Sequence, residues 1–218
     1  AEGMESSVAL RKVSRILRVH FKRVRTAAIG PDLSHRRTIV DRVVNSPTVR
    51  SAIEEEARRS GITHDQARKR ANKFAYEIAA NYSYSAIVIA ESLISWLWNR
   101  IYNGIKTNYF EELPHNALGH EVIYVPCHRS HLDYVLLSYL VHEHGFIPPH
   151  IAAGINLNLP MVGPLMRRCG AFFLRRSFRS QKLYATVFHE YLSIIQTQGV
   201  SIEYFIEGTR SRTGRLLP

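Results

Sequence analysis

Cysteine is scarce in this chain. Its 218 residues include only Cys127 and Cys169, which lie far apart and in no spacing typical of a zinc site or a redox pair. The sequence therefore indicates neither a disulfide framework nor a dithiol centre, and a reducing compartment is expected. Internal repeats and low-complexity segments are also missing, which argues against a repeat array or a disordered linker.

Acidic residues are few relative to basic ones. There are 18 Asp and Glu against 29 Lys and Arg, which gives a formal net charge of +11. Residues 11–50 alone hold eleven basic and two acidic residues, a local net charge of +9. Because a field of this sign attracts phosphates and anionic lipid alike, the balance predicts an anionic substrate or partner. Apolar residues make up 45% of the chain, enough for a globular core.

Long uninterrupted apolar runs are also lacking. Residues 1–25 are charged and have no apolar core segment, so we expect no signal peptide. The most apolar stretch, "YSYSAIVIAESLISWLWNRIY" at residues 82–102, is interrupted by Glu91 and several serines, whereas a spanning helix needs about 20 mostly apolar residues. We predict a buried core helix here. An interfacial helix, with Trp96 and Trp98 at the level of lipid headgroups, is the second interpretation, and a true span is the third.

The pattern of apolar residues divides the chain into two parts. Residues 1–113 read as helices, with Gly61 ending one of them and Thr63 capping the next. From residue 114 onward, strand-like runs alternate with helical ones: "HEVIYVP" as a short buried strand, a helix from Ser130 to about residue 142, then "IAAGIN", "GAFFLRRS", a helix ended by Gly199, and "VSIEYFIEGTRS". The sequence therefore predicts an α/β fold: a basic helical region, 1–113, followed by a domain with a mostly parallel sheet, 114–218.

Polar clusters follow three of the predicted strands. His128 comes after "VIYVP", Arg175 and Arg176 come after "AFFL", and the stretch 207–210, "EGTR", comes after "EYFI". Because the carboxyl ends of parallel strands meet at one edge of a sheet, the three clusters are expected to form a single site.

The stretch "HRSHLD" places His128 five residues before Asp133. Residues five apart in a helix are rotated by about 140°, so the two can meet only if His128 lies in the turn before the helix. Ser130 as N-cap and Asp133 three residues later form a capping-box pattern that would bring the carboxylate back over this turn. The carboxylate could then orient the imidazole as a base.

Other interpretations of this stretch stay open. The capping box could stand alone, with His128 incidental. A metal site of His128, His131 and Asp133 lacks a fourth ligand and is opposed by the charge of Arg129. Cys127 as a nucleophile has no separate activating partner in the sequence.

Arginines dominate the other two clusters, at positions 175, 176, 179, 210, 212 and 215. The guanidinium fork suits bidentate phosphate binding, and a solvated basic face is the plainer alternative. Nucleic-acid binding is not indicated, because no recognisable motif is present and the interleaved aromatic residues look like core positions.

The three clusters together resemble a known superfamily. "HRSHLD" matches the HxxxxD motif of the glycerolipid acyltransferases, "GAFFLRR" their second block and "FIEGTRSRTG" their third. The longer forms, with "GPDLSHRR" in the first half, resemble the bacterial membrane-bound glycerol-3-phosphate acyltransferases of the PlsB type. The resemblance covers essentially the whole chain. HxxxxD alone would be weak, but three ordered motifs at plausible spacing are specific.

This resemblance implies acyl transfer from acyl-CoA or acyl carrier protein, as co-substrate, to the sn-1 hydroxyl of glycerol 3-phosphate, with no metal and no cofactor. His128 would be the general base and Asp133 would orient it. The implied substrate-binding residues are Arg129, Ser130, Arg176, Glu207, Gly208, Arg210 and Arg212.

The resemblance also implies a place in the cell and partners. We expect association with a membrane lipid surface, at the cytoplasmic face of the inner membrane, and no nucleic-acid partner. The family has a fourth, proline-containing apolar block, and this chain stops at Pro218 before it. We therefore expect the 218-residue chain alone to be inactive or incomplete. The alternatives are a lysophosphatidate acyltransferase, which the large helical first half disfavours, and a non-catalytic basic module that binds phosphate or nucleic acid.

Overall fold

The structure is a computed structural model that describes residues 36–102, 104–113, 117, 120, 122–130, 132–178, 181–211, 213 and 215. The first 35 residues of the region predicted to be helical, 1–113, lie outside this part. The helices are α2 (Arg36–Asn45), α3 (Pro47–Ser60), α4 (His64–Ile78), α5 (Tyr84–Ile101), α7 (Asp133–Glu143), α8 (Val162–Arg168) and α9 (Lys182–Thr197), with 3₁₀ turns η1 (Phe110–Glu112) and η2 (Ile155–Leu157). The strands are β1 (Ile123–Tyr124), β2 (His150–Gly154), β3 (Ala171–Leu174) and β4 (Ile202–Glu203).

Local signals set the ends of the first helices as expected. Ser46 accepts a hydrogen bond from the backbone N–H of Val49, and α3 begins at the proline that follows it. Gly61 ends the same helix at φ 61°, in the left-handed region that glycine adopts without a steric penalty. Thr63 and Gln66 then form a complete capping box at the start of α4, which confirms the predicted cap.

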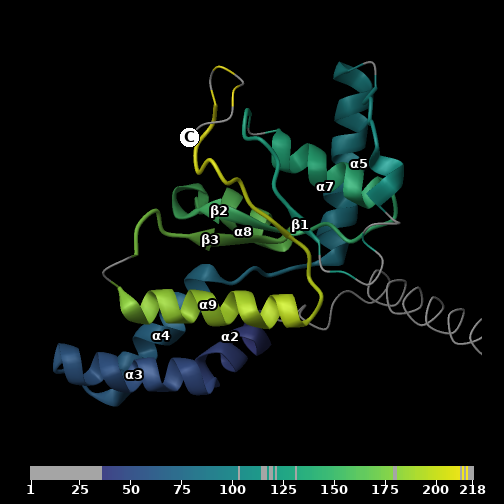
Figure 1. The fold of residues 1–218 in the computed structure, drawn as a ribbon. Helices are drawn as coiled ribbons and strands as arrows, with labels where there is room; N and C mark the ends of the chain where they lie inside the picture. Colours follow the sequence, from purple (N-terminus) through teal and green to yellow (C-terminus); the bar gives the residue numbers. More distant parts are fainter. Residues whose placement is uncertain are drawn as a thin grey trace, which may run out of the picture. The chain divides into compact units, whose positions relative to one another are not determined.

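The four strands form one all-parallel sheet in the order β1-β4-β2-β3 (Figure 1). This confirms the predicted α/β fold with a parallel sheet. One expectation about it was wrong: "HEVIYVP" contributes only the two-residue edge strand β1, and Ile123 on it is 51% exposed. An apolar run shows that a strand is present but not how many neighbours it has, and β1 pairs with β4 on one side only.

One face of the sheet is covered by α9, and α2, α3 and α4 pack against that helix in turn (Figure 1). The side chains of Ala152, Phe172 and Ile202 join this core from the sheet. Tyr191 of α9 is fully buried there, and its hydroxyl accepts a hydrogen bond from the Ala80 N–H at 3.2 Å. The first helices and a helix late in the chain therefore share one hydrophobic core.

The opposite face carries α7 and α8, with α5 packed against both. Ala153, Ala171 and Phe173 contact Met166 of α8 on this side. Arg167 anchors α8 to the first helices, since its guanidinium donates to the carbonyl oxygens of Glu77 and Ala79 at 2.7 Å each. These bonds satisfy carbonyl groups at the end of α4 that have no partner within the helix.

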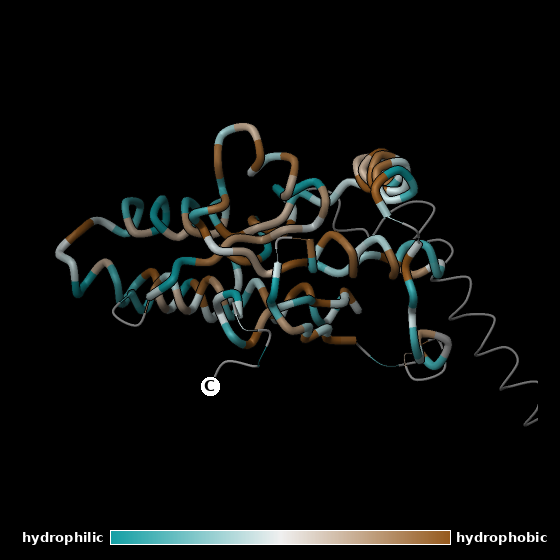
Figure 2. The backbone as a smooth tube through the Cα atoms, turned by 90° about the horizontal axis from the view of Figure 1, so that it is seen from above, coloured by the Kyte–Doolittle hydropathy of each residue, from teal (hydrophilic) through white to brown (hydrophobic). Residues whose placement is uncertain are grey.

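Helix α5 differs from its prediction as a buried core helix. Seen end-on in Figure 2, it is hydrophobic around most of its circumference, yet only Ile87 and Trp98 are buried among its described residues. Ile89, Leu93 and Trp96 are 70%, 63% and 59% exposed. The composition indicated an apolar helix correctly, but burial depends on which partners surround it. Of the described helices, none is long and apolar enough to cross a membrane.

Candidate functional site

His128 and Asp133 meet at the end of β1. His128 lies in the loop after this strand, Asp133 is the first residue of α7, and the His128 Nδ1 atom lies 3.3 Å from the Asp133 Oδ2 atom. The same oxygen accepts hydrogen bonds from the backbone N–H groups of Arg129 at 2.6 Å and Ser130 at 2.7 Å. The carboxylate therefore holds the whole loop, and with it the imidazole, over the start of the helix.

The capping geometry is only half of what the sequence predicted. The expected reach of the Asp133 carboxylate to the Ser130 N–H is present, but the helix begins at Asp133 and not at Ser130. The Ser130 hydroxyl instead accepts a hydrogen bond from the Leu132 N–H at 2.8 Å. The helix begins later than predicted because the Asp133 carboxylate accepts hydrogen bonds from the successive N–H groups of Arg129 and Ser130. These bonds keep the two residues in a turn outside the helix.

The environment keeps Asp133 ionised. Partial burial acts to raise the pKa of its carboxyl group, but the hydrogen bonds from Ser130, Arg129 and His128 outweigh this, and the pKa lies below its ordinary value. A permanently charged carboxylate against one imidazole nitrogen fixes the tautomer and favours the protonated ring after proton uptake. The pair can therefore act as an oriented base.

The loop after β4 joins the first cluster to the third. The ring of Phe205 lies 4.1 Å from that of His128, centroid to centroid, and the Ser211 N–H donates to the His128 carbonyl oxygen at 2.8 Å. Gly208 has φ 62°, a conformation that a side chain would strain. Burial raises the pKa of the Tyr134 phenol on α7, while the positive charge of Arg210 acts to lower it. Arg210 itself is exposed.

Glu207 and Arg212 complete the predicted third cluster. Glu207 is half-buried, and its two carboxyl oxygens are buried without a hydrogen-bond partner among the described residues. Arg212 lies outside the described residues. The loop thus brings Gly208, Arg210 and the Glu207 carboxyl to the strand end next to His128, since β1 and β4 are neighbours in the sheet.

The second cluster lies elsewhere. Arg176 follows β3, at the opposite edge of the sheet from β1, and three strand spacings correspond to about 14 Å. It is exposed, and among the described residues no hydrogen bond or ion pair joins it to the first or third cluster. The expected convergence of three clusters is therefore seen for two of them. Arg179 lies outside the described residues.

Arg175 is a structural residue and not part of an open phosphate site. Its Nε and terminal nitrogen atoms donate to the two carboxyl oxygens of Glu77 at 2.6 and 2.8 Å. Its guanidinium also lies over the rings of Phe74 and Tyr184. The hydrogen bonds that Arg175 donates to Glu77 raise the pKa of its guanidinium further. These contacts tie the end of β3 to α4 and α9.

An apolar groove of about 320 Å³ lies along α7, the helix that begins at Asp133. Tyr134 and Val135, the two residues after Asp133, line it from α7, and Ile151 and Ala171 form its floor on the sheet. Helices α5 and α8 form its other walls, through residues that include Ile87, Ala90, Leu93, Ile94, Leu165 and Met166.

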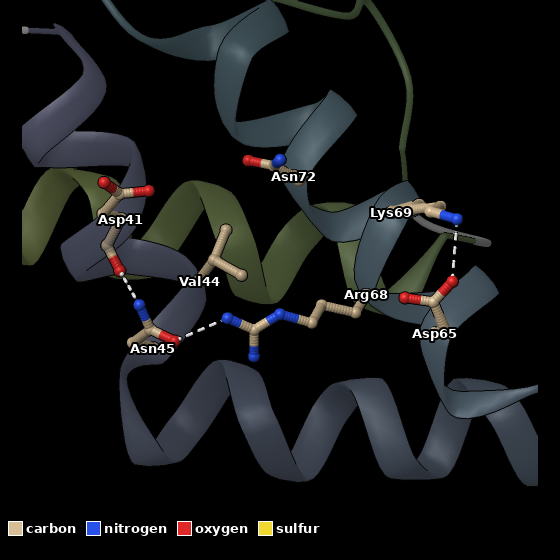
Figure 3. A pocket seen from close by; sticks show the side chains of 7 residues that line it. All are labelled: Asp41, Val44, Asn45, Asp65, Arg68, Lys69 and Asn72. Atoms are coloured by element: carbon tan, nitrogen blue, oxygen red, sulfur yellow. Dashed lines mark hydrogen bonds and ion pairs between the residues drawn. The ribbon is translucent and has the colours of Figure 1, made fainter.

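A second hollow lies on the helical layer, between α2 and α4 (Figure 3). It measures about 150 Å³ and is polar. Arg68 donates to the Asn45 side chain at 2.8 Å, and Lys69 pairs with Asp65 at 2.8 Å. The charged groups of Arg68, Lys69 and Asp65 are all engaged by neighbours in this hollow, which therefore carries no functional assignment.

Metal binding finds no further support. The metal interpretation of the sequence needs His131, which lies outside the described residues. Within the part that the structure describes, no group of three or more His, Cys, Asp or Glu side chains could hold a metal ion.

Sequence reasoning missed Phe205, Tyr134 and Glu203. Phe205 and Tyr134 read as core positions, because an aromatic residue in an apolar run is usually one. Glu203 carried a usable signal: it is a carboxylate inside the strand-like run "SIEYFI" and is fully buried in the structure. A charged residue at such a position is rare without a partner.

Comparison with known proteins agrees with the motifs. A family model described as "Acyltransferase" matches residues 105–218. A glycerol-3-phosphate acyltransferase of Pseudomonas fluorescens is 56% identical over 216 residues, which are 99% of this chain and 26% of that protein. Relatives of the same name from Pseudomonas syringae pv. tomato and Pseudomonas putida are 56% and 54% identical over 96% and 99% of this chain. The chain spans about a quarter of the length of these curated relatives.

Proposed function

This chain belongs to the acyltransferase family, and we propose that it carries the catalytic pair of a glycerol-3-phosphate acyltransferase. The reaction is transfer of an acyl group from acyl-CoA or acyl carrier protein to the sn-1 hydroxyl of glycerol 3-phosphate, giving lysophosphatidic acid. The observation that carries the proposal is the 3.3 Å approach of His128 to Asp133, held by two backbone N–H groups. The relatives that share its sequence bear the name of this activity.

His128 acts as the general base. With Nδ1 turned toward Asp133, the Nε2 atom accepts the proton of the sn-1 hydroxyl as the hydroxyl oxygen attacks the thioester carbonyl. The carbon–sulfur bond then breaks, and the departing thiolate takes the proton back from the imidazolium. Asp133 stabilises that imidazolium. Base catalysis of this kind supplies about 10²–10⁴-fold, and positioning of the two substrates supplies much of the rest.

The substrate phosphate is held by arginines of the loop after β4. Arg210 is exposed in this loop, and the N–H of the next residue, Ser211, bonds the loop to the His128 carbonyl oxygen. Arg212 and Arg176 are assigned to the phosphate through the family motifs. Glu207 and Gly208 shape the loop, and Arg129 and Ser130 contribute from the His128 side.

The apolar groove supports a donor with a long acyl chain. Tyr134 and Val135 of the first turn of α7 line the groove, so the acyl chain of a thioester held near His128 would extend along Val135 and Ile151. No metal or cofactor is needed for this chemistry.

Contact with a membrane lipid surface is part of the same proposal. The exposed face of α5 presents Leu93, Trp96 and Ile101, and Arg100 lies over the Trp96 ring at 5.9 Å. An apolar helix face with tryptophan and arginine suits the headgroup region of a bilayer. We place the protein at the cytoplasmic face of the inner membrane and expect no nucleic-acid partner.

The test is acyl transfer by a chimera in which this chain replaces the matching residues of the Pseudomonas fluorescens relative. We expect His128→Ala to lower kcat by about 10²–10⁴-fold. His189→Ala, which changes an exposed histidine on α9, is the matched control and keeps its rate. Near-normal transfer by His128→Ala contradicts the assignment.

The choice of acceptor separates the proposal from its nearest alternative. Glycerol 3-phosphate should be acylated faster than lysophosphatidate by the unaltered chimera. The reverse preference indicates a lysophosphatidate acyltransferase. Phosphate binding that survives His128→Ala, with no acyl transfer by either protein, indicates a non-catalytic module.

A further inference from the structure

Glu203 is a buried carboxyl group without a visible partner. It ends β4, an inner strand of the sheet, and its side chain is 0% exposed. Neither carboxyl oxygen has a hydrogen-bond partner among the described residues. Because burying a polar group unpaired costs stability, such a residue calls for a specific role.

The side chain of Glu203 points toward the catalytic side of the sheet. Its neighbour Ile202 packs into the core formed with α9, and successive side chains of a strand point to opposite faces. Glu203 therefore lies on the face that carries α7. In the strand register, the residues next to Glu203 are Ile151 of β2, which lines the groove, and Tyr124 of β1.

Asp133 is the first residue of α7, the helix on this face of the sheet, and its negative charge disfavours ionisation of Glu203. Burial, and after it the charge of Asp133, raises the pKa of Glu203 to about 8. At neutral pH Glu203 is therefore an uncharged acid with an O–H to donate, while Asp133 is ionised. Two carboxyl groups driven to opposite protonation states by their surroundings are typical of acid–base sites.

The unused oxygen of Asp133 fits this donor. Oδ2 receives all three recorded hydrogen bonds of the carboxylate, from His128, Arg129 and Ser130. Oδ1 has none among the described residues. The two carboxyl groups are not hydrogen-bonded to each other in this structure, and bonds within catalytic groups often tighten only when substrate is bound.

We propose that Glu203 is a positioning residue of the His128–Asp133 pair: its neutral carboxyl donates its O–H to Oδ1 of Asp133 when the site closes on substrate. This rests on the proposed function. Asp133 is then held from both sides, by the loop on Oδ2 and by the sheet on Oδ1.

The test compares Glu203→Leu and Glu203→Gln in the chimera with the Pseudomonas fluorescens relative. Leucine removes the donor, so kcat should fall roughly tenfold to a hundredfold, the range for one hydrogen bond to a charged group, with the KM for glycerol 3-phosphate little changed. Glutamine keeps a donor and should retain kcat within a few-fold at pH 7. Glutamine cannot ionise, so its kcat should also persist above pH 8, where the unaltered protein declines.

Stability measurements separate this role from a merely structural one. Replacing an unpartnered buried carboxyl by leucine should leave the Tm unchanged or raise it, so lost activity cannot be assigned to unfolding. The sign of the pH effect is also defined. The folded pKa of about 8 lies above that of an unfolded glutamate, about 4.3, so Glu203 makes the 218-residue chain lose stability as pH rises through this window. Glu203→Gln should remove the contribution of Glu203 to that loss between about pH 6.5 and 8, measured as the difference between the two proteins.

Each result has a defined consequence. Wild-type kcat in Glu203→Leu, or a wild-type alkaline decline of kcat in Glu203→Gln, overturns the inference. If His128→Ala abolishes transfer while Glu203→Leu does not, only the role of Glu203 fails. If His128→Ala remains active, the proposed function itself fails.

Discussion

The two faces of the sheet differ in how completely their side chains are buried and in whether space is left open beside them. On the face covered by α9, side chains such as Val187, Tyr184 and Ile195 are fully buried, and the buried Tyr191 hydroxyl has a hydrogen-bond partner. On the face covered by α7 and α8, an apolar groove stays open, and buried polar atoms of Ser138 and Glu203 have no partner among the described residues.

The difference separates stability from chemistry. The closed face is mostly apolar and contributes mainly free energy of folding, although the two ring nitrogens of the buried His150 on β2 have no hydrogen-bond partner among the described residues. An open face with unpaired polar groups costs stability but leaves donors and space for a substrate. The His128–Asp133 pair lies on the second face, at the start of α7. Mutations that act on stability and mutations that act on catalysis should therefore divide between the faces.

The largest expected effect on stability comes from the closed face. Val187→Ala should lower the free energy of unfolding by about 2–3 kcal/mol, because two methyl groups are lost from a fully buried site and leave a cavity. Val135→Ala makes the same chemical change at a half-buried position in the groove and should cost less than half as much. Urea unfolding of the two variants measures both values. Equal losses of unfolding free energy in the two variants would contradict the proposed difference between the faces.

Two adjacent arginines sharpen the comparison. Arg175→Ala should lower the free energy of unfolding by about 1–2 kcal/mol, since it leaves the mostly buried Glu77 carboxylate without its partner. Arg176→Ala removes an exposed side chain and should change stability by less than about 0.5 kcal/mol. In the chimera, however, Arg176→Ala should raise the KM for glycerol 3-phosphate. The assignment of Arg176 to the phosphate is wrong if that KM is unaltered.

The smallest effect on stability is expected on the outer surface of α5. Trp96→Ser changes a side chain that is 59% exposed, so the Tm should hardly move. Binding to vesicles that contain phosphatidylglycerol should nevertheless weaken a few-fold in co-sedimentation, because an interfacial tryptophan is lost. Tyr109→Ser is a matched control, an exposed aromatic residue outside α5. If both variants bind vesicles equally well, the α5 face does not contact lipid.

Local features of the fold could be predicted from the sequence because their causes are local. Gly61 ends a helix through its own backbone freedom, and Thr63 caps the next with a residue three positions away. The four strands and the α9 helix were likewise found from apolar patterns. Two expectations about burial were wrong: that the strand β1 is buried, and that the helix α5 is covered. Both depend on residues distant in the sequence, which no single-chain pattern reveals. The division of the chain at residue 113 stays a prediction.

The candidate site shows the same limit. The spacing of His128 and Asp133 indicated a loop histidine over a helix start, and the structure places them so. The sequence did not distinguish the roles of Arg175 and Arg176, because it does not show the direction in which each of two adjacent arginine side chains points. Their roles separated only when Glu77, 98 positions before Arg175, was found bonded to it.

The packing of α9 against α2, α3 and α4 has consequences for synthesis of the protein on the ribosome. The hydrogen bond between Ala80 and Tyr191 joins residues 111 positions apart. The apolar sides of α2, α3 and α4 are covered by α9, which is synthesised much later. At a synthesis rate of about 5–20 residues per second, α9 follows these helices by on the order of ten seconds. During this interval the nascent helices must rely on each other or on a chaperone, so this region is expected to be the one most prone to aggregation while the chain is being made.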